Sequence, residues 1–251
     1  MSKENFNYKK YVTDESTLKK YNEYQNKYKS KIRDSDQKII DILKRFVGTN
    51  DAPSILDMGC STGNLLYHIK KSFPNSILEG GDLSQSSIDL CKSDEDLRGI
   101  SFNITDLLEI NKYDKYDFII VNAVTYLLSS GEFEKALKSI HNALKSKGKI
   151  IDFDFFHPFD IQDLEIYETN EWHPTNAMKL HFRPYKKVKE ALESIGYGNV
   201  QFEPFIINTE LPFLGFDKDT TSYTKKDYNG QNMLFRGILY QPWCHMIAEK
   251  Q

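Results

Sequence analysis

Short apolar runs alternate with amphipathic segments through residues 36–156, and this alternation constrains the fold more than any other feature of the chain. The run Asp-Phe-Ile-Ile-Val at 117–121 is typical of a strand that is buried on both faces of a parallel sheet. Strands that alternate with helices in this way predict an α/β fold. The predicted strands are 54–58, 76–79, 100–104, 116–122 and 149–155, and the predicted helices are 36–47, 65–73, 86–91 and 133–144.

The segments beside this core have a different composition. Residues 1–35 are dense in Tyr, Lys and Asn and hold few aliphatic residues, so we expect an arm or a lid there. Residues 157–183 are polar and aromatic and too long for a plain connection, which indicates an insertion that carries function. We therefore expect a single domain over 1–251, with its core at 36–156.

The C-terminal part, 184–251, returns to a regular pattern. A helix is predicted between Pro184 and Gly196, because proline favours the first turn of a helix and glycine favours its end. Two further strands are predicted at 200–211 and 238–248, and the turn-rich stretch 212–233 between them predicts a hairpin excursion.

Charge and cysteine content exclude several classes of protein. The chain has 33 basic and 36 acidic residues, so it lacks the positive surplus that drives binding to nucleic acid. Its three cysteines are far apart and odd in number, which excludes a disulfide framework and favours a reducing compartment. No apolar segment is long enough to span a membrane, and the N-terminus has no signal-peptide core. We expect a cytoplasmic monomer or homodimer without a nucleic-acid or membrane partner.

Polar residues stand where the predicted strands end. Asp57 precedes a glycine turn, Gly59 to Gly63, whose glycines let the backbone turn sharply before a helix that offers unpaired N–H groups. Asp82, Asp106 and Asn122 end the next strands. In an open α/β sheet these positions line the crevice that binds ligands, and an acid such as Asp82 accepts two hydrogen bonds from a ribose.

Together these motifs resemble the class I S-adenosylmethionine-dependent methyltransferases of the bacterial small-molecule type, over about 36–156 and more loosely beyond. The resemblance implies a Rossmann-like, seven-stranded, mostly parallel sheet with helices on both faces and an antiparallel last strand. The matching segments are 55–63 with Ser61 where glycine is commonest, 80–84, 105–107, 121–126, and 144–151 with Ser146 and Lys147 in place of the commoner Pro-Gly.

The resemblance also implies S-adenosyl-L-methionine as cofactor, with S-adenosyl-L-homocysteine as product. Asp57 would lie by the methionine amino group, Asp82 would hold the ribose hydroxyls and Asp106 would accept from the adenine amino group. The core 36–156 is then the cofactor-binding part. The cofactor-binding residues implied are Asp57, Gly59, Cys60, Gly63, Asp82, Leu83, Asp106, Leu107, Asn122, Ala123, Tyr28 and Arg33.

The arm offers further candidates. Tyr21, Tyr24 and Tyr28 are spaced to share one helix face, where they either pack over the sulfonium or only dock the arm. Arg33 is a candidate for the methionine carboxylate, from its placement and the resemblance.

The insertion 157–183 and the fourth strand end supply the acceptor side. His157 is the candidate general base, with a structural histidine as the alternative. Arg183 is a candidate to pair with an anionic acceptor, with a surface arginine as the alternative. Asp152 and Asp154 favour a hydrogen-bonding pair over a metal site, and no metal is expected. The predicted substrate-binding residues are Tyr126, Trp172, His173 and Arg183.

The predicted activity belongs to EC class 2.1.1: methyl transfer to an oxygen or nitrogen of a small anionic or sugar-type metabolite. A catalytically silent cofactor-binding subunit stays open as an alternative. The G-x-S-x-G pattern at 59–63 also fits the nucleophile elbow of an α/β-hydrolase that uses Ser61, but no HGGG-type segment is present. A nicotinamide site is disfavoured because Ser61 stands at the second glycine of G-x-G-x-x-G.

Overall fold

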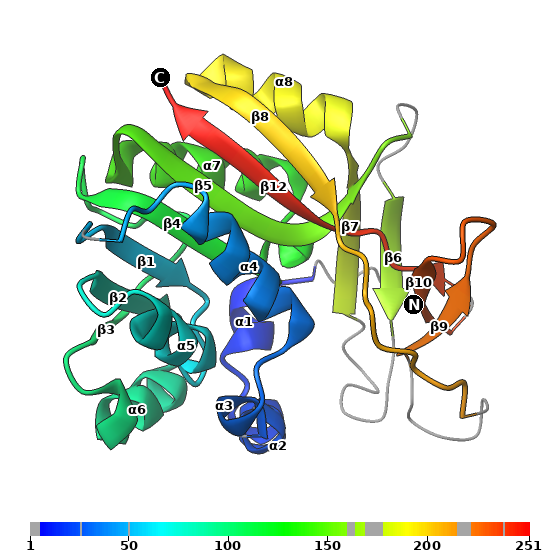
Figure 1. Cartoon of the computed structure of the whole chain (residues 1–251), viewed down its shortest axis with the longest axis horizontal. Coiled ribbons are helices and arrows are strands. Elements are labelled where there is room, and N and C mark those ends of the chain that lie inside the picture. Colours follow the sequence, from blue (N-terminus) through cyan, green and yellow to red (C-terminus); the bar gives the residue numbers. More distant parts are fainter. Residues whose placement is uncertain are drawn as a thin grey trace.

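A mostly parallel sheet forms the centre of the molecule (Figure 1). The computed structural model describes residues 6–25, 27–49, 51–159, 164–168, 178–214, 222–237 and 239–251. Along the main path the strand order is β3-β2-β1-β4-β5-β12-β8. The strands are β1 (Ser54–Met58), β2 (Ile77–Asp82), β3 (Ser101–Ile104), β4 (Tyr116–Asn122), β5 (Leu144–His157), β8 (Tyr197–Pro204) and β12 (Trp243–Lys250).

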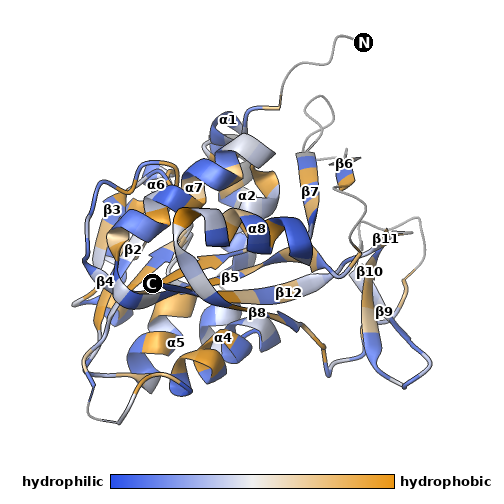
Figure 2. Cartoon of the chain, turned by 90° about the horizontal axis from the view of Figure 1, so that it is seen from above, coloured by the Kyte–Doolittle hydropathy of each residue, from blue (hydrophilic) through white to orange (hydrophobic). Residues whose placement is uncertain are grey.

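Strands β1 to β5 pair in parallel, whereas β12 runs antiparallel to both of its neighbours, β5 and β8. The α/β class and the antiparallel last strand are therefore confirmed. A parallel sheet needs crossover connections, and helices supply them on both faces. Figure 2 shows α4 and α5 on the face opposite α7 and α8. The helices of the core are α4 (Asp34–Lys44), α5 (Asn64–Ser72), α6 (Gln85–Ser93), α7 (Ser130–Ala143) and α8 (Tyr185–Ile195).

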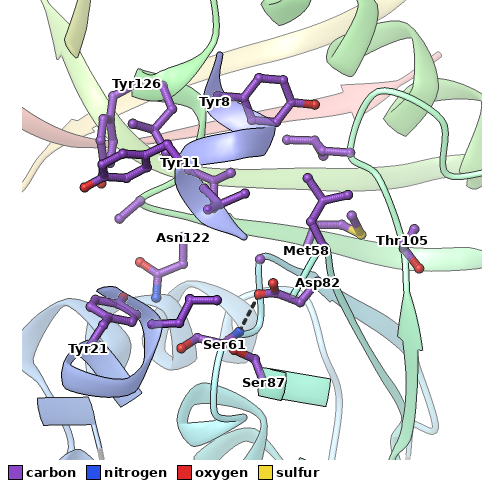
Figure 3. Close-up of a pocket in the computed structure, with 18 residues that line it drawn as sticks. Tyr8, Tyr11, Tyr21, Met58, Ser61, Asp82, Ser87, Thr105, Asn122 and Tyr126 are labelled. Carbon is purple, nitrogen blue, oxygen red and sulfur yellow. Dashed lines mark hydrogen bonds between the residues drawn. The ribbon is translucent and has the colours of Figure 1, made fainter. Parts of the chain in front are cut away.

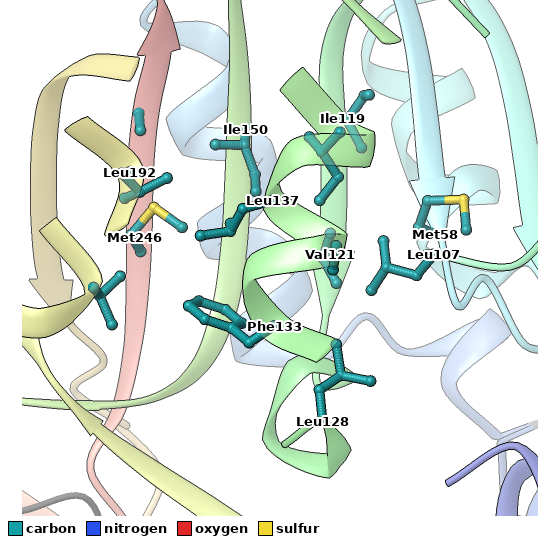
Figure 4. Packing of buried hydrophobic residues seen from close by; sticks show 14 of the residues in the cluster. Met58, Leu107, Ile119, Val121, Leu128, Phe133, Leu137, Ile150, Leu192 and Met246 are labelled. Carbon is teal, nitrogen blue, oxygen red and sulfur yellow. The ribbon is translucent and has the colours of Figure 1, made fainter. Parts of the chain in front are cut away.

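Alternate side chains of the central strands feed two hydrophobic clusters. Leu56 and Met58 of β1 join the cluster under α7 and α8, and Ile55 joins the cluster with α4, α5 and α6. Figure 4 shows the first cluster, in which Leu137 of α7 and Leu192 of α8 pack against the sheet. This period of two buries both faces of the strand.

The N-terminal residues form three short helices that lie near the carboxyl ends of the central strands (Figure 1). These helices are α1 (Tyr8–Val12), α2 (Glu15–Gln25) and α3 (Lys27–Ser30). Within the described part of the chain, no helix has the length and the apolar character of a membrane span.

Two small strand units extend beyond the main path. In the insertion, β6 (Leu164–Glu168) and β7 (Met178–Pro184) form an antiparallel pair, and β7 joins the end of β5 in parallel. The predicted excursion is a hairpin of β9 (Ser222–Lys226) and β10 (Asn232–Arg236), extended by β11 (Leu239–Tyr240) into a separate sheet. Trp172 and His173 lie outside the described residues.

Several predicted boundaries were wrong. The strand predicted at 200–211 ends at Pro204, where the chain leaves the sheet, and the one predicted at 238–248 begins only at Trp243. Proline lacks the backbone hydrogen that would continue a ladder. The fifth strand begins at Leu144, because the predicted turn is an irregularity inside the strand, with Lys147 in the left-handed region at φ 63°.

Candidate active site

One pocket lies where β1, β2 and β4 end, and the arm helices cover it (Figure 3). Its empty volume, which includes the open solvent at the mouth, is about 970 Å³. The described lining residues are Tyr8, Tyr11, Val12, Leu18, Tyr21, Met58, Gly59, Ser61, Asp82, Leu83, Ser87, Thr105, Leu107, Asn122, Ala123, Val124, Tyr126 and Leu127.

The turn after β1 brings backbone close to this pocket. Gly59 and Gly63 have φ of 78° and 75°, in the left-handed region that favours glycine. A Cβ on Gly59 would lie 2.5 Å from Cγ2 of Val124, so any other residue there would have to displace the Val124 side chain. Ser61 adopts φ 49° without being glycine, and its N–H donates to Oδ2 of Asp82 at 2.9 Å.

Asp82 closes the floor of the pocket. Its two carboxylate oxygens each accept a backbone N–H at 2.9 Å, from Ser61 and from Ser84. Figure 3 shows Asp82 beside Ser61. Burial raises the pKa of Asp82 above its ordinary value, against the lowering effect of these N–H groups. Each oxygen keeps a further lone pair for a ligand hydroxyl.

A buried acid that sequence reasoning missed stands behind the pocket. Asp36 of α4 is fully buried and accepts Nε of Arg33 and Nδ2 of Asn122, each at 2.9 Å. Asp36 lies one turn before Ile39 and Ile40, on the apolar face of α4. An acidic residue on the apolar face of an amphipathic helix is unusual, and this pattern in the sequence could have identified Asp36 as a functional candidate.

Asp57 is 2% exposed, and its Oδ1 has no hydrogen-bond partner among the described residues. Burial, then the charges of Asp36 and Asp82, raise the pKa of Asp57 to about 8. Neither Asp57 nor Arg33 belongs to the described lining of the pocket.

The arm already engages Asp106, the predicted adenine acceptor. Its carboxylate accepts the hydroxyl of Tyr8 at 2.9 Å, pairs with Lys9 at 2.5 Å and accepts the N–H of Leu108. Burial raises the pKa of Asp106, but the hydrogen bonds from Lys9, Leu108 and Tyr8 outweigh burial and leave the pKa below its ordinary value. Its neighbours Thr105 and Leu107 line the pocket, whereas Asp106 does not.

The three predicted arm tyrosines do not act together. Tyr21 lines the pocket, whereas the hydroxyls of Tyr24 and Tyr28 lie 2.9 Å apart outside it. The guanidinium carbon of Arg33 lies 4.9 Å from the ring centroid of Tyr28. Sequence reasoning missed Tyr8 and Tyr11 as pocket residues, because the sequence does not show where an arm docks. Two other predicted cofactor residues, Cys60 and Gly63, shape the glycine turn and do not line the pocket.

On the acceptor side, Tyr126 lines the pocket and lies beside Tyr11 (Figure 3). Its ring packs 5.4 Å from Phe155 and 6.2 Å from Trp243, measured between centroids. His157 is buried outside the described lining, with Nδ1 accepting the N–H of Phe159 at 3.3 Å.

Arg183 is buried and turned toward the protein. Its guanidinium donates to the carbonyls of Thr125, at 3.1 Å, and Leu128, and it lies 4.3 Å from the ring centroid of Phe133. Arg183 thus braces the turn after β4 and is absent from the described lining. It was predicted to meet an anionic acceptor, and the described contacts give it a structural role.

The pair Asp152 and Asp154 holds the same turn from β5. Oγ1 of Thr125 donates to Asp154 at 2.8 Å and to Asp152 at 3.1 Å, and the N–H of Tyr126 donates to Asp154 at 2.8 Å. Burial raises the pKa of Asp154 to about 6 and raises that of Asp152 well above its ordinary value. The pair is hydrogen-bonded, as predicted. In the described part of the chain, no group of His, Cys, Asp or Glu side chains is arranged to hold a metal ion.

Comparison with known proteins agrees with this geometry. Residues 55–148 match the family model described as a methyltransferase domain, over the segment that carries the glycine turn, Asp82 and Asn122. This chain carries a class I S-adenosylmethionine-dependent methyltransferase domain. The methyltransferase domain therefore includes β1 to β4, whose carboxyl ends form the pocket.

Two curated relatives each match part of the chain. The malonyl-[acyl-carrier protein] O-methyltransferase of Bacillus cereus is 25% identical over 119 residues, which cover 47% of this chain and 44% of the relative. The carboxy-S-adenosyl-L-methionine synthase of Nautilia profundicola is 33% identical over 116 residues, which cover 43% and 46%. The chain thus spans less than half the length of these relatives.

Among solved structures, a SAM-dependent methyltransferase of Methanosarcina mazei has a TM-score of 0.58 at 14% identity. The match covers 83% of this chain and 96% of that chain, so the shared methyltransferase fold extends beyond 55–148.

The geometry does not support the alternative of an α/β-hydrolase that uses Ser61. Oγ of Ser61 has no hydrogen-bond partner among the described residues, so no base stands ready to activate it.

Proposed function

We propose that this chain binds S-adenosylmethionine and moves its methyl group to an oxygen or nitrogen of a small-molecule acceptor. The observation that carries the proposal is the set of polar groups at the carboxyl ends of β1, β2 and β4, gathered at one pocket. Oδ1 of Asp57 and Oγ of Ser61 are buried without partners among the described residues. Buried atoms of this kind are rare in folded proteins, and a polar ligand would satisfy them.

The residues present fit the parts of the cofactor. Asp82 would hold the ribose hydroxyls, and Asp57 would face the amino group of the methionine part. Asn122 and Ala123 would pass beneath the sulfonium. When bound, the cofactor supplies a methyl carbon activated by that sulfonium. The protein supplies alignment and a dry site, and Tyr11 and Tyr21 of the arm exclude water from above.

Of the two predicted acceptor types, the pocket favours the uncharged, sugar-type metabolite over the anionic one. The described lining holds no lysine, arginine or histidine side chain, whereas it holds Tyr11, Tyr21 and Tyr126. A tyrosine combines an apolar ring face with a hydrogen-bonding hydroxyl, which suits a polyhydroxylated ring. These three tyrosines in the pocket also favour a working enzyme over a catalytically silent binding subunit.

His157 stays the proposed proton acceptor. Its Nε2 is buried and has no partner among the described residues, and His157 is the last residue of β5, at the same edge of the sheet as Asp57. If it takes the proton, His157→Ala should lower turnover by roughly 10² to 10⁴ while leaving cofactor affinity unchanged.

Two measurements test the proposal. Isothermal titration calorimetry with S-adenosylhomocysteine should give a dissociation constant in the micromolar range. A screen of neutral sugars, nucleotide-linked sugars and small carboxylates, with S-adenosylhomocysteine formation as the signal, should find turnover among the uncharged compounds. A folded sample that binds neither S-adenosylmethionine nor S-adenosylhomocysteine would refute the proposed function.

A further inference from the structure

The first arm helix, α1, is fastened to the rim of the pocket at Asp106. The hydroxyl of Tyr8 donates to Oδ1 of Asp106 at 2.9 Å, and Nζ of Lys9 pairs with Oδ2 at 2.5 Å. Asp106 follows β3 and stands between Thr105 and Leu107, which both line the pocket. These two contacts, from Tyr8 and from Lys9, hold α1 against the edge of the pocket, and we call them the latch.

Helix α1 depends on its contacts with the rest of the protein. It has five residues, and a helix of this length is not stable by itself in water. The ring of Tyr8 is 4% exposed and belongs to the hydrophobic cluster under α7 and α8. When α1 moves away from the pocket, we therefore expect it to lose its helical structure as well as its packing.

The next arm helices, α2 and α3, are anchored at a different place. Nδ2 of Asn64, at the start of α5, donates to the carbonyl of Gln25 at 2.8 Å, and both residues are buried. Nζ of Lys29 pairs with Asp94, beyond α6, at 2.6 Å. The connection between α1 and α2 is residues 13–14, so α1 can move there while α2 and α3 stay in place.

While it is latched, α1 covers part of the pocket. Tyr8, Tyr11 and Val12 belong to α1 and line the pocket. Figure 3 shows Tyr8 and Tyr11 on the helix that crosses it. A ligand that fills the pocket lies against these side chains, so it enters and leaves more easily when α1 has moved away.

We infer that α1 is a lid, that the latch of Tyr8 and Lys9 on Asp106 holds it closed, and that it opens for exchange of the cofactor. The part of the inference that concerns the cofactor rests on the proposed function. Oδ1 of Asp106 accepts both the hydroxyl of Tyr8 and the N–H of Leu108, and these two donors use both of its lone pairs. In the closed state this oxygen therefore serves the lid and not a ligand.

Hydrogen exchange followed by mass spectrometry tests the latch in the ligand-free chain. Tyr8→Phe keeps the buried ring and removes the donor to a carboxylate, so the amide protons of α1 should exchange about tenfold faster, while those of α2 do not change. Lys9→Met removes an ion pair whose lysine is 51% exposed, so its effect should be smaller, about two- to fivefold. The matched control is Lys10→Met, at the exposed neighbouring position of the same helix, which should behave as the unmodified chain.

Surface plasmon resonance with S-adenosylhomocysteine tests the lid. If the lid limits access to the pocket, a weaker latch raises the fraction of open chain. Tyr8→Phe should then raise the association rate constant about tenfold, together with the dissociation rate constant. Loss of a contact between Tyr8 and the ligand would instead raise the dissociation rate constant alone. Circular dichroism establishes that each variant is folded.

The outcomes separate the inference from the proposed function. Unchanged exchange of α1 in Tyr8→Phe, or faster exchange of α1 and α2 together, would overturn the latch. An association rate constant equal to that of the unmodified chain would overturn the role of α1 as a lid and leave the proposed function intact. Absence of S-adenosylhomocysteine binding by the folded, unmodified chain would refute the proposed function, while hydrogen exchange would still decide whether the latch exists.

Discussion

Replacing Arg183 with methionine should destabilise the fold, although the sequence suggested a role in substrate binding. The side chain is 5% exposed, and its guanidinium donates to the carbonyls of Thr125 and Leu128. Methionine keeps the length of the apolar stem but removes the charge and every donor. The carbonyls of the turn after β4 would lose their charged donor in a place that water does not reach.

The expected magnitude follows from these contacts. A buried acceptor that loses a charged partner costs about 1–3 kcal/mol, and two such carbonyls together with the contact to Phe133 give a loss of about 3–5 kcal/mol in the free energy of unfolding. The pair Asp152 and Asp154 would also lose a nearby cation, which raises the pKa of both acids further.

Urea unfolding followed by circular dichroism measures this loss. Arg98→Met is the matched control, because the side chain of Arg98 is 77% exposed and forms a surface ion pair with Glu95. Surface pairs of this kind contribute little, so Arg98→Met should leave the unfolding curve unchanged. An unchanged curve for Arg183→Met, together with a raised Michaelis constant for an anionic acceptor, would refute the bracing role and restore the role in anion binding.

Three further predictions follow from single contacts. Gly59→Ala should weaken S-adenosylhomocysteine binding at least about tenfold in calorimetry, because φ is 78° and the new Cβ would lie 2.5 Å from Val124; an unchanged affinity would mean that Val124 moves aside. Asp82→Ala should cost about 1.5–3 kcal/mol of binding, against no change for the exposed Asp89→Ala, and equal affinities would show that another acid holds the ribose. Burial lowers the pKa of His245 to about 4, so its folded state binds fewer protons than the unfolded chain between pH 4 and 6.5. Stability is therefore lost as pH falls, and from pH 7 to 5 the unmodified chain should lose about 2 kcal/mol of unfolding free energy more than His245→Phe does; equal losses would show that His245 does not titrate in this way.

The succession of strands and helices along the chain was predictable because it depends on local patterns. The run at 116–122 matches β4 to the residue, and the glycine turn after β1 lies where the spacing placed it. The boundaries near Pro204 and Lys147 were missed, because they depend on which neighbouring strand is available for pairing. Apolar periodicity reports what is buried, but it does not report where a ladder stops.

The site was only partly predictable, because its cover comes from distant parts of the chain. The hydroxyl of Tyr8 meets Asp106 across 98 positions, and no local pattern in the sequence indicates that pairing. Arg183 shows the same limit. Arg183 was predicted to bind substrate partly because arginine is rare in this chain. In the structure it donates to two backbone carbonyls, and the sequence does not show that these carbonyls lack another donor.

Satisfaction of hydrogen bonds distinguishes the acids that support the fold from the acid that is proposed to bind the cofactor. Asp154 is buried near Asp152 and Arg183, much as Asp57 is buried near Asp36 and Arg33. Yet Asp154 accepts Thr125 Oγ1 and two backbone N–H groups, so its environment is complete without a ligand. Oδ1 of Asp57 has no such donor among the described residues. A buried carboxyl oxygen without a hydrogen-bond donor costs free energy. A ligand that donates a hydrogen bond to Oδ1 of Asp57 would remove this cost, and this supports the proposal that Asp57 binds a ligand.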